Sequence, residues 1–279
     1  MSGLISSLKA ALSTPRNDGT LHFSQHLQHD RHTVLYYEYG YPNVDSPWSN
    51  VFPLVQGTGV HNLVHEAMCN LTGMAQYTPE FAVKAPEEDF KYPWGGTVDA
   101  IMSYYGENWI IDYKTISGAG MSFLDGEVKP EHKLQVSAYK TFLPDMDFTT
   151  GILYLPSSPD YKRRWDEPVL MAFEPYTSKQ IYARMHNVEA AIDSYVSTGA
   201  LPDAPLGEYV WKKKYKYWQA VYKPHYTSMF CPWASLHDDP CGCSKATYKV
   251  IAEYKKGTLT IEEGYDTIVE EMGMPDEVL

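Results

Sequence analysis

The sequence has few cysteines, few basic residues and no long apolar segment. Its 279 residues include four cysteines. That is too few for a small secreted disulfide scaffold, so we expect an intracellular, reducing compartment. No apolar run approaches the ~20 residues that span a bilayer. The N-terminus also lacks the basic start, long apolar centre and cleavage site of a secretion signal. We therefore expect no membrane partner.

Basic residues are outnumbered by acidic ones. The chain has 23 Lys and Arg against 35 Asp and Glu, a net charge of −12. Such a protein repels phosphate over most of its surface, so binding to nucleic acid requires a local basic groove or bound metal ions. Hydrophobic residues make up 44% of the chain, which is enough to build a core.

Hydrophobic periodicity and turn residues divide the chain into three parts. We expect an N-terminal arm over residues 1–55, a core over 56–200 and a helical extension packed on the core over 201–279. The expected elements are a helix over 57–75, strands over 79–86 and on both sides of 104–108, a helix over 130–144, a strand over 148–156 and a helix over 177–199. This order predicts an α/β fold with a mixed central sheet flanked by helices.

The segment GGTVDAIMSYYGENWIIDYKTISG, residues 95–118, is an apolar hairpin that carries Asp99, Asp112 and Lys114. A turn centred on Tyr105 and Gly106 would place Asp99 opposite Asp112, with Cβ atoms about 5 Å apart. Two buried carboxylates at that distance repel each other unless a cation neutralises them, and Mg²⁺ prefers carboxylate oxygens. The alternative is a structural ion pair between Asp112 and Lys114. We favour the metal site.

The spacing of these residues resembles that of the PD-(D/E)XK nuclease superfamily, and more narrowly its RecB-type, lambda-exonuclease-like branch. Asp112 follows Asp99 by thirteen positions, and the second strand reads IIDYKT with Lys114. The branch also has a Gly-Thr-x-x-His motif upstream, matched by GTGVH ending at His61, and a Gln-x-x-x-Tyr motif downstream, matched by QVSAY. The resemblance implies a restriction-endonuclease-like core.

The resemblance also implies roles for individual residues. The expected metal ligands are His61, Asp99, Asp112 and the backbone carbonyl of Tyr113. Lys114 would position the attacking water, while Gln135 and Tyr139 would hold Lys114 or a DNA phosphate from one helical face. Thr115 would contact a phosphate. His65 competes with His61 as a ligand, and Glu66 and Glu80 are further candidates that are better explained as surface charges.

A second basic feature is the segment YVWKKKYKYWQAVYKPHY, residues 209–226. Its lysines, including Lys212, Lys213 and Lys216, alternate with aromatic residues, a pattern suited to single-stranded DNA. The aromatic residues also fall at helical spacing, so the alternative is a core stripe on a helix. Arg163 and Arg164 form a further candidate phosphate contact.

The cysteines are one early residue and three late ones. Some RecB-type nucleases, including the CRISPR-adaptation and AddB types, resemble this chain in such a set, which in them holds a [4Fe–4S] cluster. The four are Cys69, Cys231, Cys241 and Cys243. Ser228 stands where the family has a further cysteine, so we rank the absence of a cluster first, the cluster second, and a zinc site of the three late cysteines with His237 third; buried free thiols are a further alternative.

Together these features predict a Mg²⁺- or Mn²⁺-dependent DNA exonuclease that acts on DNA ends in recombination, repair or genome processing. The alternatives are a structure-specific or restriction-like endonuclease, and a nucleic-acid-binding scaffold without catalysis. After Lys256 the chain has acidic residues and no basic ones. This end would face solvent or dock a basic partner, such as a recombination or single-strand-binding protein.

Overall fold

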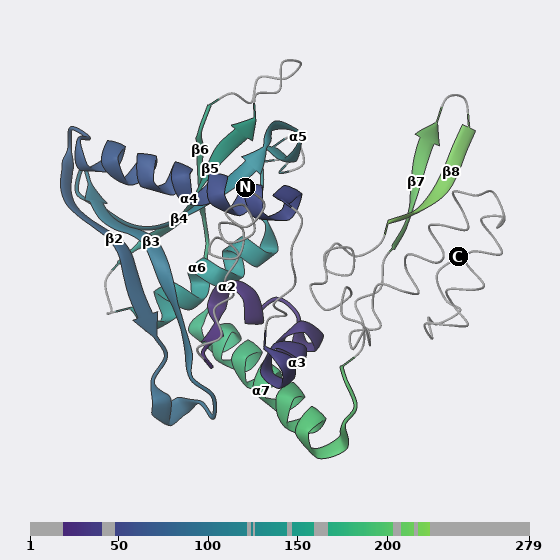
Figure 1. Cartoon of the computed structure of the whole chain (residues 1–279). Coiled ribbons are helices and arrows are strands. Elements are labelled where there is room, and N and C mark those ends of the chain that lie inside the picture. The colour runs from purple at the N-terminus through teal and green to yellow at the C-terminus, as the bar shows by residue number, and fades with distance from the viewer. Residues whose placement is uncertain are drawn as a thin grey trace, which may run out of the picture.

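The computed structural model describes residues 19–40, 48–121, 124, 126–143, 147–158, 167–202, 208–214 and 217–223. Helices and strands are interspersed along the chain (Figure 1). The strands are β1 Leu21–His22, β2 Met74–Lys84, β3 Trp94–Tyr104, β4 Glu107–Ser117, β5 Thr149–Ser158, β6 Val169–Phe173, β7 Glu208–Lys214 and β8 Tyr217–Lys223. The helices are α2 Phe23–His26, α3 Asp30–Tyr39, α4 Trp48–Cys69, the 3₁₀ turn η1 Glu87–Asp89, α5 Gly118–Met121, α6 Pro130–Phe142 and α7 Ser178–Thr198.

Six strands form one mixed sheet in the order β1-β3-β4-β5-β6, with β2 paired to β3. The strands β2, β3 and β4 are antiparallel neighbours, whereas β4 and β5 are parallel. Because a parallel pair needs a crossover, α6 fills the connection between β4 and β5. The α/β fold with a mixed sheet flanked by helices is confirmed, and it is consistent with a restriction-endonuclease-like core.

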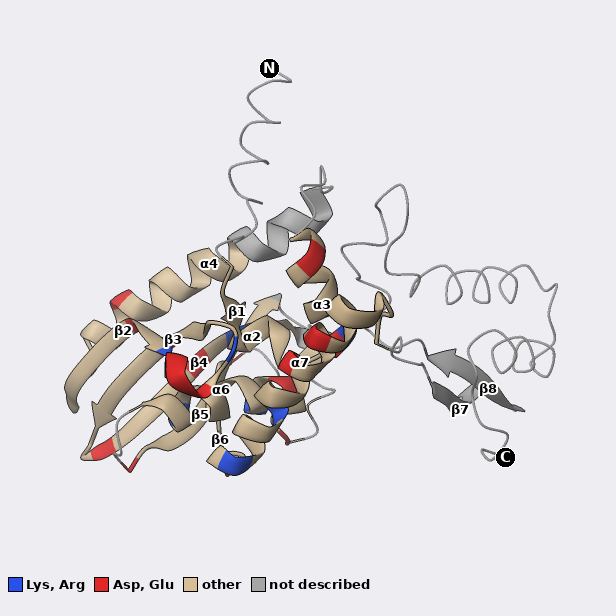
Figure 2. Ribbon diagram, turned by 90° about the horizontal axis from the view of Figure 1, so that it is seen from below, with Lys and Arg blue, Asp and Glu red and all other residues tan. Residues whose placement is uncertain are grey.

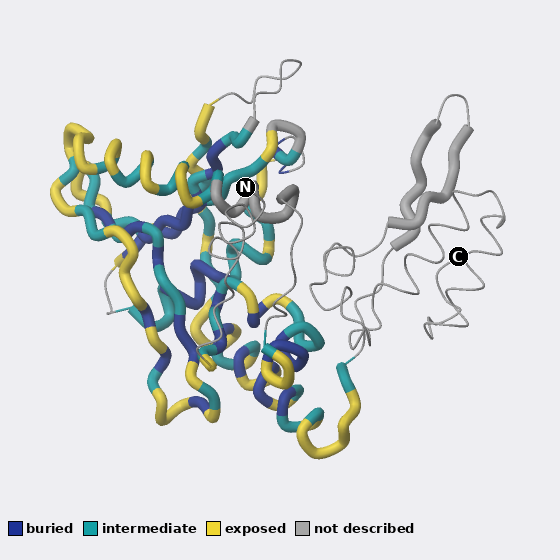
Figure 3. Tube along the Cα trace, viewed as in Figure 1, coloured by how far each residue is buried: buried dark blue, intermediate teal, exposed yellow. Residues whose placement is uncertain are grey.

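The two faces of the sheet carry cores of different size. The larger core packs residues of β3, β4 and β5 against α2, α3, α6 and α7, with Phe23, Val136 and Ile181 fully buried. The smaller core packs Ala100 and Ile111 against α4. In Figure 3 buried stretches follow the central strands, whereas the visible turns of α4 are exposed or half-buried. The sheet is therefore deeply covered on one face and lightly covered on the other.

The N-terminal part departs from the expected arm. Residues 19–40 form β1, α2 and α3, and they contribute Leu21, Phe23, Val34 and Leu35 to the larger core. Helix α4 begins at Trp48, so the expected boundary at residue 55 falls inside a helix. The His-rich sequence of this segment hid short elements whose aliphatic and phenylalanine side chains are buried.

The helical interpretation of the 209–226 segment is wrong for the strands β7 and β8. They pair antiparallel with Lys212 opposite Gln219 and Lys213 opposite Trp218, in a two-stranded sheet of their own. Aromatic and β-branched residues favour strands, and that preference prevailed over the helical spacing. Whether this hairpin packs on the core stays a prediction. Strand β6 was not expected either.

Candidate active site

The site lies where β3 and β4 separate. Their ladder runs from Tyr104 opposite Glu107 to Ala100 opposite Ile111. The expected register of the hairpin is confirmed as far as Ala100 opposite Ile111, and the ladder ends one position short of Asp99 and Asp112. Beyond them β4 continues to pair with β5 as far as Ser117, while β3 pairs with β1 at Trp94 and Gly95. The aspartates thus stand at a fork between two strands.

The backbone turns Asp99 toward β4 and α4. Val98 belongs to the larger core and Ala100 to the smaller one, so the strict alternation of side chains is interrupted at Asp99. Glu80, the next residue across the register of β2 and β3, has a left-handed φ of 49°. The backbone N–H of Tyr113 donates to Asp99 Oδ2 at 2.6 Å, and this bond closes the fork.

Asp112 is held from the α6 side. Its side chain is buried, and Oδ1 accepts a hydrogen bond of 2.7 Å from Gln135 Nε2. Lys114 Nζ lies 2.8 Å from Oδ2, within ion-pair distance, but without the geometry of a hydrogen bond, so that buried oxygen accepts none. Lys114 instead donates to Gln135 Oε1 at 2.9 Å, and Gln135 Nε2 also donates to Tyr139 at 2.9 Å.

Histidines of α4 approach the fork from the other face. His61 Nδ1 lies 3.7 Å from Asp99 Oδ1, and the His61 ring stands edge-on to Tyr113. One turn later, His65 Nδ1 is hydrogen-bonded to the Tyr77 hydroxyl of β2. That hydroxyl lies 3.4 Å from the Tyr113 hydroxyl. His65 therefore contacts the aromatic side chain of Tyr113, and His61 is the histidine that reaches the aspartate.

The electrostatics of the fork favour a cation. Burial, and then the charge of Asp112, raise the pKa of Asp99 to about 7. The Tyr113 N–H and the charge of Lys114 act against this rise. Burial lowers the pKa of His61, while Asp112 and a hydrogen bond to the Tyr113 backbone raise it less. His61 is therefore neutral at pH 7, the form in which its lone pair can bind a metal.

The described residues contain no group of three or more His, Cys, Asp or Glu side chains arranged to hold a metal ion. Mg²⁺ does not require such a group, because it is bound through one or two carboxylates, water and substrate phosphates. The buried Asp112 Oδ2 that accepts no hydrogen bond fits this requirement. Asp99, with its pKa raised beside Asp112, fits it as well. The donors at the fork suit a hard divalent cation.

The other expected residues are placed as follows. Thr115 faces α4, where a Cβ on Gly57 would lie 3.3 Å from its Oγ1, so the Gly of GTGVH permits close packing of α4 on β4. Glu66 and Glu80 are exposed. Cys69 is a free, exposed thiol, so the alternative of a buried thiol does not hold for it. Lys212 and Lys213 lie on β7. Lys216, Arg163, Arg164, Cys231, His237, Cys241, Cys243 and the acidic C-terminal end lie outside the described residues.

Sequence reasoning missed Tyr77 and considered His65 only as a rival of His61 for the metal. The Tyr77–His65 hydrogen bond joins β2 to α4, and only the folded structure brings those elements together. The signal available in the sequence was the spacing of His61 and His65, which places both on one helical face.

Comparisons with known proteins identify no family. No family model matches the chain, and no curated protein matches it. The crystal structure of SSO0001 is similar over 68% of this chain and 85% of that chain, with 16% sequence identity and a TM-score of 0.47. A similarity at this level says nothing about function. No described helix is long and apolar enough to cross a membrane.

Proposed function

We propose that the protein is a Mg²⁺- or Mn²⁺-dependent deoxyribonuclease that hydrolyses phosphodiester bonds from DNA ends. The observation that carries the proposal is the strand fork with two aspartates. One of them, Asp112, has a buried oxygen that accepts no hydrogen bond. An ammonium group, Lys114, stands 2.8 Å from it. Carboxylates could hold a metal ion that polarises a phosphoryl oxygen, and a lysine beside it could position the attacking water.

The metal would be held by Asp99, Asp112, the Tyr113 carbonyl and His61, and it would neutralise charge on the scissile phosphate. Lys114 would position the attacking water. Its ammonium donates to Gln135 Oε1 at 2.9 Å, which leaves further protons for a water or a phosphate oxygen. Gln135 and Tyr139 fix its position, because both are buried on α6 and hydrogen-bonded to each other.

The surroundings assist by excluding water from one side of the fork. Tyr139 and Asp112 are almost fully buried, so the fixed hydrogen bonds of this side are stronger than they would be in water. On the α4 side, His61 and Asp99 are partly exposed, with 27% and 19% of their side chains accessible. Substrate would therefore enter from the side of α4.

Acidic and basic residues are interspersed over the described helices (Figure 2), in a protein with a net charge of −12. DNA binding would therefore depend on the metal and on local lysines such as Lys212 and Lys213. The exonuclease assignment rests on the resemblance of the motifs to RecB-type enzymes. Its alternatives, an endonuclease and a binding scaffold without catalysis, predict different results in a cleavage assay.

The test is a time course on end-labelled linear DNA and on closed circular DNA, in Mg²⁺, in Mn²⁺ and in EDTA. We expect linear DNA to be degraded from its ends, closed circles to survive and EDTA to stop the reaction. Lys114→Gln should abolish cleavage, whereas Lys179→Gln, on the exposed face of α7, should not. Cleavage of closed circles would indicate an endonuclease. Binding without cleavage in either metal would indicate a scaffold.

A further inference from the structure

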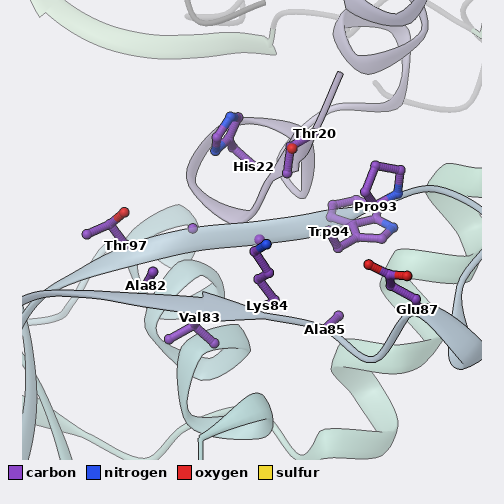
Figure 4. Close-up of a pocket in the computed structure, with 12 residues that line it drawn as sticks. Thr20, His22, Ala82, Val83, Lys84, Ala85, Glu87, Pro93, Trp94 and Thr97 are labelled. Carbon is purple, nitrogen blue, oxygen red and sulfur yellow. The ribbon is translucent and has the colours of Figure 1, made fainter. Parts of the chain in front are cut away.

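A cavity of about 320 Å³ opens beside the start of β3. Figure 4 shows Lys84 between the strands, Thr97 toward one end, and Glu87 and Trp94 toward the other. Residues of β1, β2, β3 and the turn before β3 line it: Thr20, His22, Ala82, Val83, Lys84, Ala85, Glu87, Pro93, Trp94, Gly95, Gly96 and Thr97. A volume of this size lies at the lower end of the range for small-molecule sites, about 300–1,000 Å³.

The cavity lies on the α4 face of the sheet. Val83 is buried in the larger core, and Gly96, its partner across the ladder, lies against Tyr139 and Phe23 of that core. Successive residues of a strand point to opposite faces, so Ala82, Lys84, Gly95 and Thr97 face the other way. That face is the one on which α4 packs against Ala100 and Met102, further along β3.

The cavity lies next to the fork along β3, although no described residue of the fork lines it. Thr97 precedes Asp99 by two residues on β3, a separation of about 7 Å along a strand. On the opposite face of the sheet, Tyr139 holds the backbone between the two places, because it accepts a hydrogen bond from the Thr97 backbone and another from Gln135. The absence of a side chain at Gly96 lets the Tyr139 ring lie close to β3, since a Cβ there would lie 2.8 Å from that ring.

The chemistry of the lining suits a phosphate. Lys84 is exposed and has no ion pair or hydrogen bond with any residue that the structure describes. Its charge stands among the hydroxyl groups of Thr20 and Thr97 and the ring of His22. Lysine and threonine side chains are among the usual partners of DNA phosphates. Glu87, at the far end in Figure 4, would keep an anion toward the end nearest the fork.

We propose that this cavity is a nucleotide subsite next to the cleaved bond, in which Lys84 pairs with a phosphate of the DNA strand. The proposal rests on the proposed function, since it takes DNA as the substrate. It gives an acidic protein a local basic contact on the open face of its sheet. It also extends the DNA path along β3, toward β1.

The test measures binding in EDTA, where cleavage is not expected, by fluorescence anisotropy of a short labelled single strand over a range of salt concentrations. We expect Lys84→Gln to weaken binding and to lower the slope of log K against log[salt] by about 0.7, the value for one phosphate contact on a single strand. Lys179→Gln on α7 is the matched control, because it is an exposed lysine outside the cavity, and its affinity and slope should equal those of the parent.

A second variant fills the space rather than removing the charge. Ala82→Phe places a ring in the cavity from the exposed face of β2, and we expect it to weaken binding and to raise KM. Ala75→Phe, an exposed residue of the same strand outside the cavity, is its control. Unchanged affinity and slope in both Lys84→Gln and Ala82→Phe, in a parent that cleaves DNA, would overturn the subsite and leave the nuclease standing. If both variants bind DNA more weakly than a parent that never cleaves, the phosphate contact at Lys84 is supported and the nuclease is overturned.

Discussion

The two helices that supply the candidate site hold their residues in different ways. Gln135 and Tyr139 of α6 are buried and hydrogen-bonded to each other, and Gln135 also bonds to Asp112 and Lys114. The described turns of α4, from residue 56 to 69, are half-buried or exposed, and His61 lies 3.7 Å from Asp99. The α6 side is thus a fixed frame, and the α4 side is the open side. Changes on the α6 side should affect stability and cleavage together, whereas changes on the α4 side should affect mainly cleavage.

The largest expected effect comes from Asp112, which belongs to the frame and to the metal site. Asp112→Asn keeps the shape of the side chain but removes its charge. Because metal ions contribute several kcal/mol to such reactions, we expect cleavage in Mg²⁺ to fall by about 10²-fold or more. The control is Asp147→Asn, an exposed aspartate remote from the fork in sequence. If Asp112→Asn cleaves linear DNA as fast as the parent, the metal site is wrong.

The next effect is on stability and concerns pH. The pKa of Asp99 is raised to about 7 in the folded protein. In the unfolded chain it is about 4. Between these values the folded state binds more protons than the unfolded state, so the free energy of unfolding falls as pH rises. The upper bound of the loss from pH 4 to pH 8 is about 4 kcal/mol, at 1.36 kcal/mol per pKa unit.

This prediction is measured by denaturant unfolding in EDTA at several pH values. Asp99→Asn should flatten the dependence between pH 4 and pH 8. Mg²⁺ should stabilise the parent more at pH 8 than at pH 5, because it binds the ionised form. If the free energy of unfolding of the parent does not change between pH 4 and pH 8, the raised pKa of Asp99 is contradicted.

A third substitution tests the fixed frame on the α6 side without changing the open side. Gln135→Leu leaves Asp112 Oδ1 without its hydrogen bond. An unsatisfied buried acceptor costs about 1–3 kcal/mol. Loss of an outer ligand contact lowers metal affinity or activity by about 10–100-fold. We expect both effects, measured by unfolding and by Mn²⁺ titration. Gln76→Leu, on the exposed face of β2, should show neither.

The sequence predicted the fixed frame better than the open side. The register of β3 and β4 followed from the turn at Tyr105 and Gly106, where both residues have positive φ, and local turn geometry sets the pairing of a hairpin. Gln135 and Tyr139 followed from helical spacing. By contrast, the cavity joins Thr20 to Lys84, and Tyr77 meets His65 across two elements. Such contacts depend on tertiary packing, which no local pattern contains.

On the open side, Tyr77→Phe removes one hydroxyl from the pair that positions Tyr113. A single hydrogen bond contributes about 0.5–1.5 kcal/mol, so we expect cleavage to fall by about two- to tenfold. Stability should change less than in Gln135→Leu, because Tyr77 is only partly buried. Tyr105→Phe, at a side chain that is 72% exposed, is the control. Equal cleavage in the two variants would mean that the hydroxyl contact does not position Tyr113.

The smallest expected effect is at Glu66, on the outer face of α4. At 100° per residue, Glu66 stands about 140° around the helix from His61. Its side chain is exposed, and its backbone carbonyl accepts a hydrogen bond of 2.8 Å from Asn70. Glu66→Gln should therefore leave unfolding within about 0.5 kcal/mol of the parent, as surface substitutions do. Its cleavage rate and its Mn²⁺ affinity should also match the parent, whereas His61→Gln should lower both. If Glu66→Gln weakened Mn²⁺ binding as much as His61→Gln, the outer face of α4 would be part of the metal site, and the open side would extend around the helix.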